Sequence, residues 1–152
     1  MTDTFNLQRF VAAQESEIDL AMRELKAGKK ESCWMWYIFP QFLGLGSSMM
    51  SRTYAISSQE EALAFLAHPI VGARLRACTQ TVLDLQGRTA QQIFSGDDIK
   101  FHSCMTLFAA AESSPNIFEM ALSKYFNGAQ DNATLVLLDQ CMRQQGCSPT
   151  QQ

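Results

Sequence analysis

Apolar side chains recur at intervals of three and four residues along most of the chain, a spacing that places them on one face of an α-helix. Leu7, Phe10 and Val11 share such a face, and the spacing continues as far as Gly28, a residue type common at helix C-termini. Ser16, followed three positions later by an acidic residue, has the pattern of a new N-cap. We therefore expect two helices, or one bent helix, before Gly28.

Further along the chain, helix boundaries are marked by capping residues, prolines and glycines. Ser58 begins a capping box, and Asp97 or Asp98, Ser114 and Asp131 occupy later N-cap positions. The predicted helical segments are 58–68, 69–87, 89–96, 97–113, 114–128 and 132–146. No pair of alternating strands joined by an Asn-Gly or Asp-Gly turn occurs, so we predict an all-α class, a compact multihelical single domain of about six to eight helices. This domain spans residues 1–152, with a core over about 6–145 and a frayed tail at 146–152.

Composition and charge narrow the class of protein. The chain has 152 residues, of which 47% are hydrophobic and 18% charged, as in a single soluble globular domain. A net charge of −3 and a pI near 5.3 argue against a nucleic-acid partner. The only basic cluster, Lys26, Lys29 and Lys30, is interpreted as cations at a helix C-terminus. No apolar stretch is long enough to cross a membrane, and the N-terminal stretch lacks a secretory signal.

The five cysteines are odd in number and include no C-x-x-C pair. This pattern predicts neither a disulfide framework nor a zinc site, and it favours reduced thiols in a cytoplasmic protein. We predict no metal and no cofactor. The sequence leaves the oligomeric state open.

The segment from Cys33 to Phe42, CWMWYIFPQF, holds both tryptophans of the chain and no charge. As a core segment, it would bury its rings and supply partners for the indole N–H groups and the tyrosine hydroxyl. As a pocket wall, its flat faces would stack on an aromatic ligand or hold a cation, beside a Gly-rich loop at 44–48 that permits close backbone approach. Alternating side chains can point both ways, so the two interpretations are compatible.

The pocket interpretation predicts one site, where this segment meets the helix start at Asp98. Its ligand would be small and polar or aromatic, with nucleotide-like molecules among the candidates. The predicted ligand-binding residues are Trp34, Trp36, Tyr37, Phe39, Gln41, Ser48, Asp98 and Lys100.

The helix after Asp98 also supports an enzymatic hypothesis. Lys100, Ser103 and Cys104 share one face of it. A desolvated lysine can act as a base or favour a nearby thiolate, so Lys100 with Ser103 or His102 is the candidate catalytic group of a hydrolase or transferase. In the structural alternative, Cys104 is core, Ser103 bonds back to the preceding turn and Lys100 reaches the surface. A third hypothesis is an interaction protein that docks a partner through the aromatic segment.

Six stretches carry a recognisable pattern, namely RFVAAQ, AMRELKAGKK, WMWYIFPQFLGLGSS, YAISSQEEALAFLAHPIVGARL, IFSGDDIKFHSCMTLF and KYFNGAQDNATLVLL. From about Leu7 to Leu138 the chain resembles the bacterial family known as domain of unknown function 1810, and WMWYIFPQ is its specific motif. The resemblance implies a small helical domain with no established activity. The family pattern falls on Trp34, Trp36, Tyr37, Phe39, Pro40, Gln41, Gly44, Gly46, Ser48, Asp98, Lys100, Ser103 and Thr106.

Cys104 stands where the family pattern has a serine, which weakens any role that needs a hydroxyl at this position. Some family members carry the label calpastatin, an inhibitor of calcium-dependent cysteine proteases. Such inhibitors are disordered repeats rich in proline and charge, whereas this chain is apolar and rich in helix caps.

Overall fold

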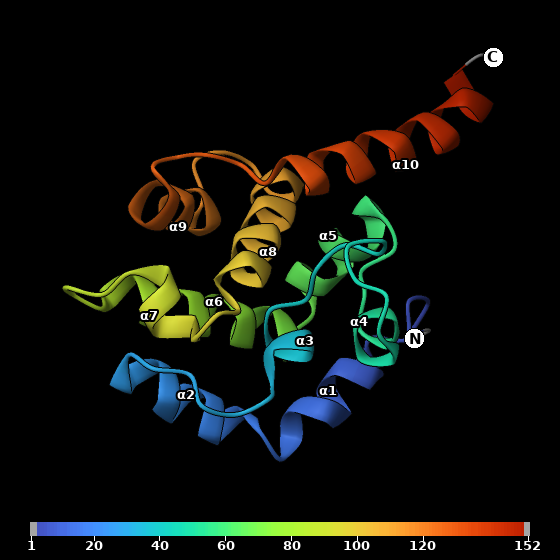
Figure 1. Cartoon of the computed structure of the whole chain (residues 1–152). Helices are drawn as coiled ribbons and strands as arrows, with labels where there is room; N and C mark the ends of the chain where they lie inside the picture. The colour runs from blue at the N-terminus through green and yellow to red at the C-terminus, as the bar shows by residue number, and fades with distance from the viewer. Residues whose placement is uncertain (1–2, 151–152) are drawn as a thin grey trace.

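A computed structural model describes the backbone of residues 3–150 and the side chains of residues 3–144. Ten helices form within residues 3–150 (Figure 1). They are α1 (Gln8–Glu15), α2 (Ile18–Ala27), α3 (Met35–Ile38), α4 (Met49–Thr53), α5 (Gln59–Ala67), α6 (Val71–Asp84), α7 (Ala90–Phe94), α8 (Asp98–Ala111), α9 (Ile117–Phe126) and α10 (Asn132–Thr150). The frayed tail predicted at 146–152 falls on residues whose side chains lie outside the described part, and 151–152 lie outside it altogether.

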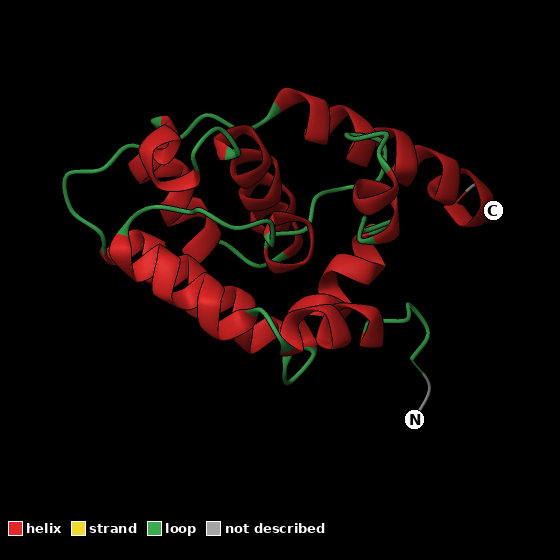
Figure 2. Ribbon diagram, turned by 60° about the horizontal axis from the view of Figure 1, so that its bottom comes forward, coloured by secondary structure: helices red, strands yellow, loops and turns green. Residues whose placement is uncertain are grey.

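The all-α prediction is confirmed, but the predicted number of helices is too low. Helices α3, α4 and α7 contain only four or five residues each. A single turn is too short to show a helical period in the sequence. Figure 2 shows helices and loops but no strand over residues 3–150; an isolated bridge between Phe42 and Ile56 is the one strand-like pairing there.

Helix α8 forms the centre of the molecule (Figure 1). It packs against α5, α7, α9 and α10, while α6 packs against α2, α5 and α9. Because α8 has neighbours on several sides, its apolar residues surround the helix instead of forming one stripe. Its buried apolar side chains are Phe101, Cys104, Met105, Leu107, Phe108 and Ala109.

Most helix ends form as the sequence predicts. Gly28 ends α2 in the left-handed conformation, with φ of 80°. The Ser58 side chain caps α5, and Asp131 accepts the Thr134 backbone N–H at the start of α10. His68 separates α5 from α6, and its Nδ1 accepts backbone N–H groups from the first turn of α6.

Two predicted caps, at Ser114 and Ser16, are wrong, and Asp97 stands at the start of α8 without a side-chain cap bond. Asn116, not Ser114, caps α9, because its side chain accepts the Glu119 N–H and its amide also donates to carbonyl groups at the end of α8. The Ser114 hydroxyl instead donates to the Glu119 carboxylate. Ser16 does not cap α2, which begins after Glu17 without a side-chain cap.

The turn that leads from α2 into the aromatic segment is organised by the Glu24 carboxylate. Its Oε1 accepts the backbone N–H groups of Glu31 at 2.8 Å and Ser32 at 3.0 Å, and the indole N–H of Trp34 at 2.9 Å. Its Oε2 accepts the Ser32 hydroxyl at 2.6 Å. Burial acts to raise the pKa of Glu24, but these hydrogen bonds outweigh it and hold the pKa below its ordinary value.

Replacing Glu24 with glutamine should flatten the acid side of the stability profile. Because the folded-state pKa is the lower one, the Glu24 carboxylate stabilises the fold fully above the unfolded-state pKa of about 4.3, and this contribution is lost as the pH falls through the folded-state value. Urea unfolding at steps between about pH 6 and pH 3 should therefore give a shallower slope for Glu24→Gln than for the unmodified chain. Trp34→Phe, which removes one of the four hydrogen bonds, should give an intermediate slope. An unchanged slope for Glu24→Gln would contradict this role.

Candidate functional site

The aromatic segment divides into a buried and an exposed part. The one turn of α3 and its flanking residues bury Trp34 and Phe39 completely, and Tyr37 almost completely. Trp36 is only partly buried. The core interpretation therefore holds for Trp34, Tyr37 and Phe39, whereas Trp36 reaches the surface.

The prediction that Trp34, Tyr37 and Phe39 contact a ligand needs correction, because all three lie in the core. The Trp34 N–H is used by Glu24, and the Phe39 ring lies edge-on to Phe101, with 5.2 Å between centroids. The Tyr37 ring packs edge-on against Tyr54, at 5.3 Å. Their N–H groups and ring faces are thus occupied by neighbours within the fold.

Four other predicted residues do meet in one place. Trp36, Gln41, Ser48 and Lys100 line a single cavity of about 410 Å³, here called the Trp36 cavity. Its remaining lining residues are Leu45, Gly46, Ser47, Ser51, Gly96 and Ile99. The walls come from the segment 36–51 and from the start of α8, which are far apart in the sequence.

The bridge between Phe42 and Ile56 holds the first of these walls in place. The Leu43 N–H donates to the Ile56 carbonyl at 2.9 Å, and the Ile56 N–H donates to the Gln41 carbonyl at 2.9 Å. The loop between them is thereby closed at its base. At Gly46 the backbone passes so close to Ser51 that an added Cβ would lie 2.7 Å from its Oγ, so this position requires glycine.

The second wall carries a chain of charges that continues into the core. The Lys100 ammonium lies 3.0 Å from one Asp97 carboxylate oxygen, and Lys30 lies 2.9 Å from the other. Burial acts to raise the pKa of Asp97, but the hydrogen bonds and charges of the two lysines outweigh it, so this pKa is lowered. Lys30 is only 8% exposed and lies over the Trp34 ring. Two ammonium groups therefore share one carboxylate at the edge of the Trp36 cavity.

Sequence reasoning missed Lys30 and Asp97 as members of this group. Lys30 was interpreted as a helix-end cation, and Asp97 was interpreted only as a cap. In the structure the Asp97 carboxylate makes no cap hydrogen bond. Nothing local in the sequence signals an ion pair between residues so far apart along the chain.

The predicted catalytic partners of Lys100 lie elsewhere. The Ser103 hydroxyl is buried and donates to Ile99 and to Asp131 Oδ2, at 3.1 and 2.8 Å. His102 stacks on Phe126 and places its Nε2 2.8 Å from the Ala129 carbonyl oxygen. Ser103 therefore lies at the start of α10, and His102 lies beside α9. Neither residue lines the cavity with Lys100.

Two further candidates have structural positions. Asp98, the first residue of α8, is partly buried and does not line the Trp36 cavity. Cys104 is completely buried, and burial raises the pKa of its thiol well above the ordinary value. This thiol is therefore protonated at neutral pH and is not an activated nucleophile.

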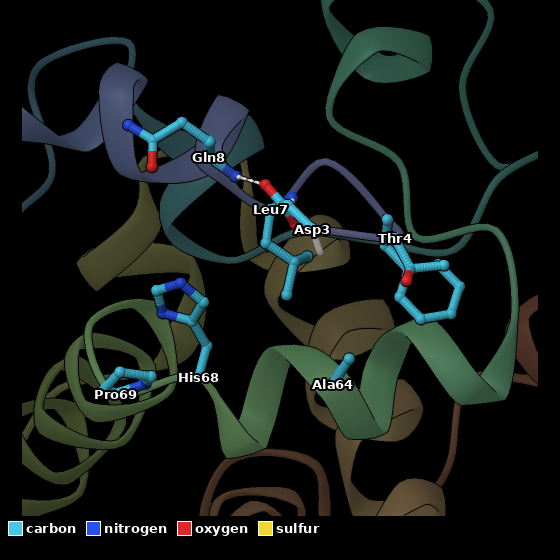
Figure 3. A pocket seen from close by; sticks show the side chains of 8 residues that line it. Asp3, Thr4, Leu7, Gln8, Ala64, His68 and Pro69 are labelled. Carbon is cyan, nitrogen blue, oxygen red and sulfur yellow. Dashed lines mark hydrogen bonds between the residues drawn. The ribbon is translucent and has the colours of Figure 1, made fainter. Parts of the chain in front are cut away.

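Two other hollows lie elsewhere in the described part of the chain. One, of about 480 Å³, lies between the N-terminal segment and the end of α5 (Figure 3). Its Asp3 carboxylate accepts the Leu7 and Gln8 N–H groups, and its His68 caps α6. An open groove of about 620 Å³ between α6 and α9 includes Lys124, whose ammonium donates to backbone carbonyl groups.

Only some of the polar side chains that line the Trp36 cavity are bonded within the protein. Among the lining side chains within residues 3–144, the Ser48 and Ser51 hydroxyls are bonded to each other and to the loop backbone, whereas the Trp36 indole N–H, the Gln41 amide and the Ser47 hydroxyl form no hydrogen bond within the protein. The Lys100 ammonium has three N–H donors, of which one is directed to Asp97. These groups are open to an incoming molecule.

Two general features complete the description. None of the helices formed by residues 3–150 combines the length and the apolar character needed to span a membrane. Within the described part of the chain, no three His, Cys, Asp or Glu side chains gather as metal ligands would.

The fold and the cavity together define a single all-helical domain with a partly aromatic surface pocket. The chain belongs to the family described as Protein of unknown function (DUF1810), whose model matches residues 4–138. This confirms the family resemblance. A solved structure, that of the conserved hypothetical protein Rv1873 from Mycobacterium tuberculosis, is similar over 90% of this chain and 99% of its own, with 46% sequence identity and a TM-score of 0.88. No curated protein matches the sequence of this chain.

Proposed function

We propose that this protein binds a small polar or aromatic molecule in the Trp36 cavity, with nucleotide-like compounds among the candidates. One observation supports the proposal: several polar side chains with hydrogen-bonding capacity not used within the protein line the same cavity as a partly exposed indole. These groups are the Trp36 N–H, the Gln41 amide, the Ser47 hydroxyl and two N–H donors of Lys100.

The size and character of the cavity support this proposal. Its volume of about 410 Å³ falls within the usual range for small-molecule sites, about 300–1,000 Å³. Such sites combine apolar walls with a few convergent polar groups. Trp36, Leu45 and Ile99 supply the apolar part here.

The two tryptophans allow a direct test. In a Trp34→Phe variant, Trp36 is the only tryptophan, so its fluorescence reports on the cavity. Small molecules released from the purified protein by denaturation are identified by mass spectrometry and titrated back. We expect saturable quenching of Trp36. In the chain that retains Trp34, we expect Trp36→Ala to weaken binding about fivefold or more, because base–aromatic stacking contributes about 1–3 kcal/mol.

A matched control separates this effect from instability. Trp36 is only partly buried, so Trp36→Ala should lower the free energy of unfolding much less than it lowers the free energy of binding. The melting temperature measures the first of these changes. Ser123→Ala, in the groove between α6 and α9, should change neither. Equal losses of affinity and stability in Trp36→Ala would show that the indole is a packing residue and would contradict the proposal.

A further inference from the structure

We infer that the ligand of the Trp36 cavity is an anion, a carboxylate or phosphate attached to a flat ring, and that Lys100 receives its charge. The inference rests on the proposed function and specifies the chemical class of the ligand. It is argued from the charges, the hydrogen-bond donors and the apolar wall of the cavity.

The lining of the cavity is positive. Among its lining residues, Lys100 is the only charged one. Its nearest carboxylate, Asp97, is shared with the buried Lys30, so two positive charges face one negative charge. Asp98, one residue further along, is a second carboxylate at the start of α8, but it does not line the cavity.

The free polar groups are mostly donors. A lysine ammonium and an indole N–H can only donate hydrogen bonds, and the Gln41 amide and Ser47 hydroxyl can also donate. The Ser48 and Ser51 hydroxyls donate their protons within the loop, to Ser51 Oγ at 3.0 Å and to the Ser48 carbonyl at 2.9 Å, so only acceptor lone pairs remain on these two groups. A group with several acceptor oxygens and a negative charge matches this set, because charge-assisted hydrogen bonds are the strongest of their kind.

The apolar wall calls for a flat or hydrocarbon part in the same molecule. Trp36 presents its indole on one side, and Ile99, which is 70% exposed, stands at the start of α8. An aliphatic side chain this exposed is covered when a ring enters the cavity. A free inorganic anion would leave both side chains in water.

Matched pairs of compounds test the inference on the full-length chain. Each pair shares a ring and differs in its anionic group: AMP with adenosine, and benzoate with benzamide. Titration calorimetry should show the anionic member binding about tenfold more tightly at low salt, the size of one hydrogen bond to a charged group. Added salt should reduce this preference. Inorganic phosphate and acetate lack a ring and should bind more weakly than AMP and benzoate. The tighter binder of phosphate and acetate identifies the preferred anionic group.

Lys100 variants complete the test. Lys100→Gln should remove the preference for the anionic member while leaving the neutral member unchanged, and Lys100→Arg should retain the preference. If neutral and anionic members bind equally to the unmodified chain, or if Lys100→Gln keeps the preference, the inference is overturned and the proposed function stands. If no ring compound binds and no small molecule is released from the purified protein, both are overturned.

Discussion

Replacing Arg9 with alanine should lower the free energy of unfolding by about 3–5 kcal/mol, because it leaves a buried carboxylate without its partner. The Arg9 guanidinium lies 2.9 Å from Glu61, a residue only 2% exposed. It also donates to the carbonyl oxygens of Phe5 at 2.6 Å, Thr53 at 2.8 Å and Ala55 at 2.8 Å. For a chain of this size, such a loss lowers the melting temperature by roughly 6–20 °C.

Two variants separate charge from geometry at this position. Arg9→Lys keeps the charge but cannot reproduce the fork of donors, so it should lose an appreciable part of the stability. The double variant Arg9→Ala/Glu61→Gln should be less destabilised than the sum of the two single variants, since it no longer buries an unpaired charge. Additive losses would show that Arg9 and Glu61 do not interact, which would contradict the predicted coupling.

Replacing Phe101 with alanine should destabilise the fold by a similar amount, about 3–5 kcal/mol, because it opens a cavity in the middle of the core. The completely buried Phe101 ring stacks on Phe94, with centroids 4.4 Å apart, and lies edge-on to Phe39 at 5.2 Å. Tyr125 and Phe126 of α9 complete its surroundings. One side chain thus joins the aromatic segment, α7, α8 and α9. Denaturant unfolding measures the loss.

Phe101→Leu is the matched control for this cavity effect. It keeps most of the buried volume and should cost about 1.5 kcal/mol or less. Leu43→Ala, at a surface position of the loop after Gln41, should stay within about 0.5 kcal/mol of the unmodified chain. An alanine variant at Phe101 as stable as the leucine variant would show that the core closes around the gap, contrary to the expectation.

The helical class could be predicted because the relevant signals are local. Ser58, Asp131 and Gly28 act within one turn of their own positions, so short stretches of sequence are sufficient to place them. The single turn of α3 could not be predicted, because four residues are too few to show the helical spacing of apolar side chains. The capping role of Asn116 also escaped prediction, because Ser114 and Pro115 offered the same local pattern two residues earlier.

The candidate site was predicted in part, and for a physical reason. The chemical character of the side chains correctly predicted that Trp36, Gln41 and Lys100 lie close together. It could not show which aromatic rings of the segment 33–42 face the core. Trp34 and Phe39 have the same chemistry as Trp36, and only their neighbours from α2, α7 and α8 decide that they are buried. The Lys30–Asp97 pair depends on tertiary contacts that a short stretch of sequence does not contain.

The paired backbone at Phe42 and Ile56 has an evolutionary consequence. Since the segment between them is closed at its base, exposed side chains such as Ser47 can be exchanged without disturbing the helices below, while Gly46 stays fixed. Such changes would reshape one side of the pocket while the lysine on α8 stays in place. Under the proposed function, such exchanges would give different ligand preferences to proteins that share one helical scaffold.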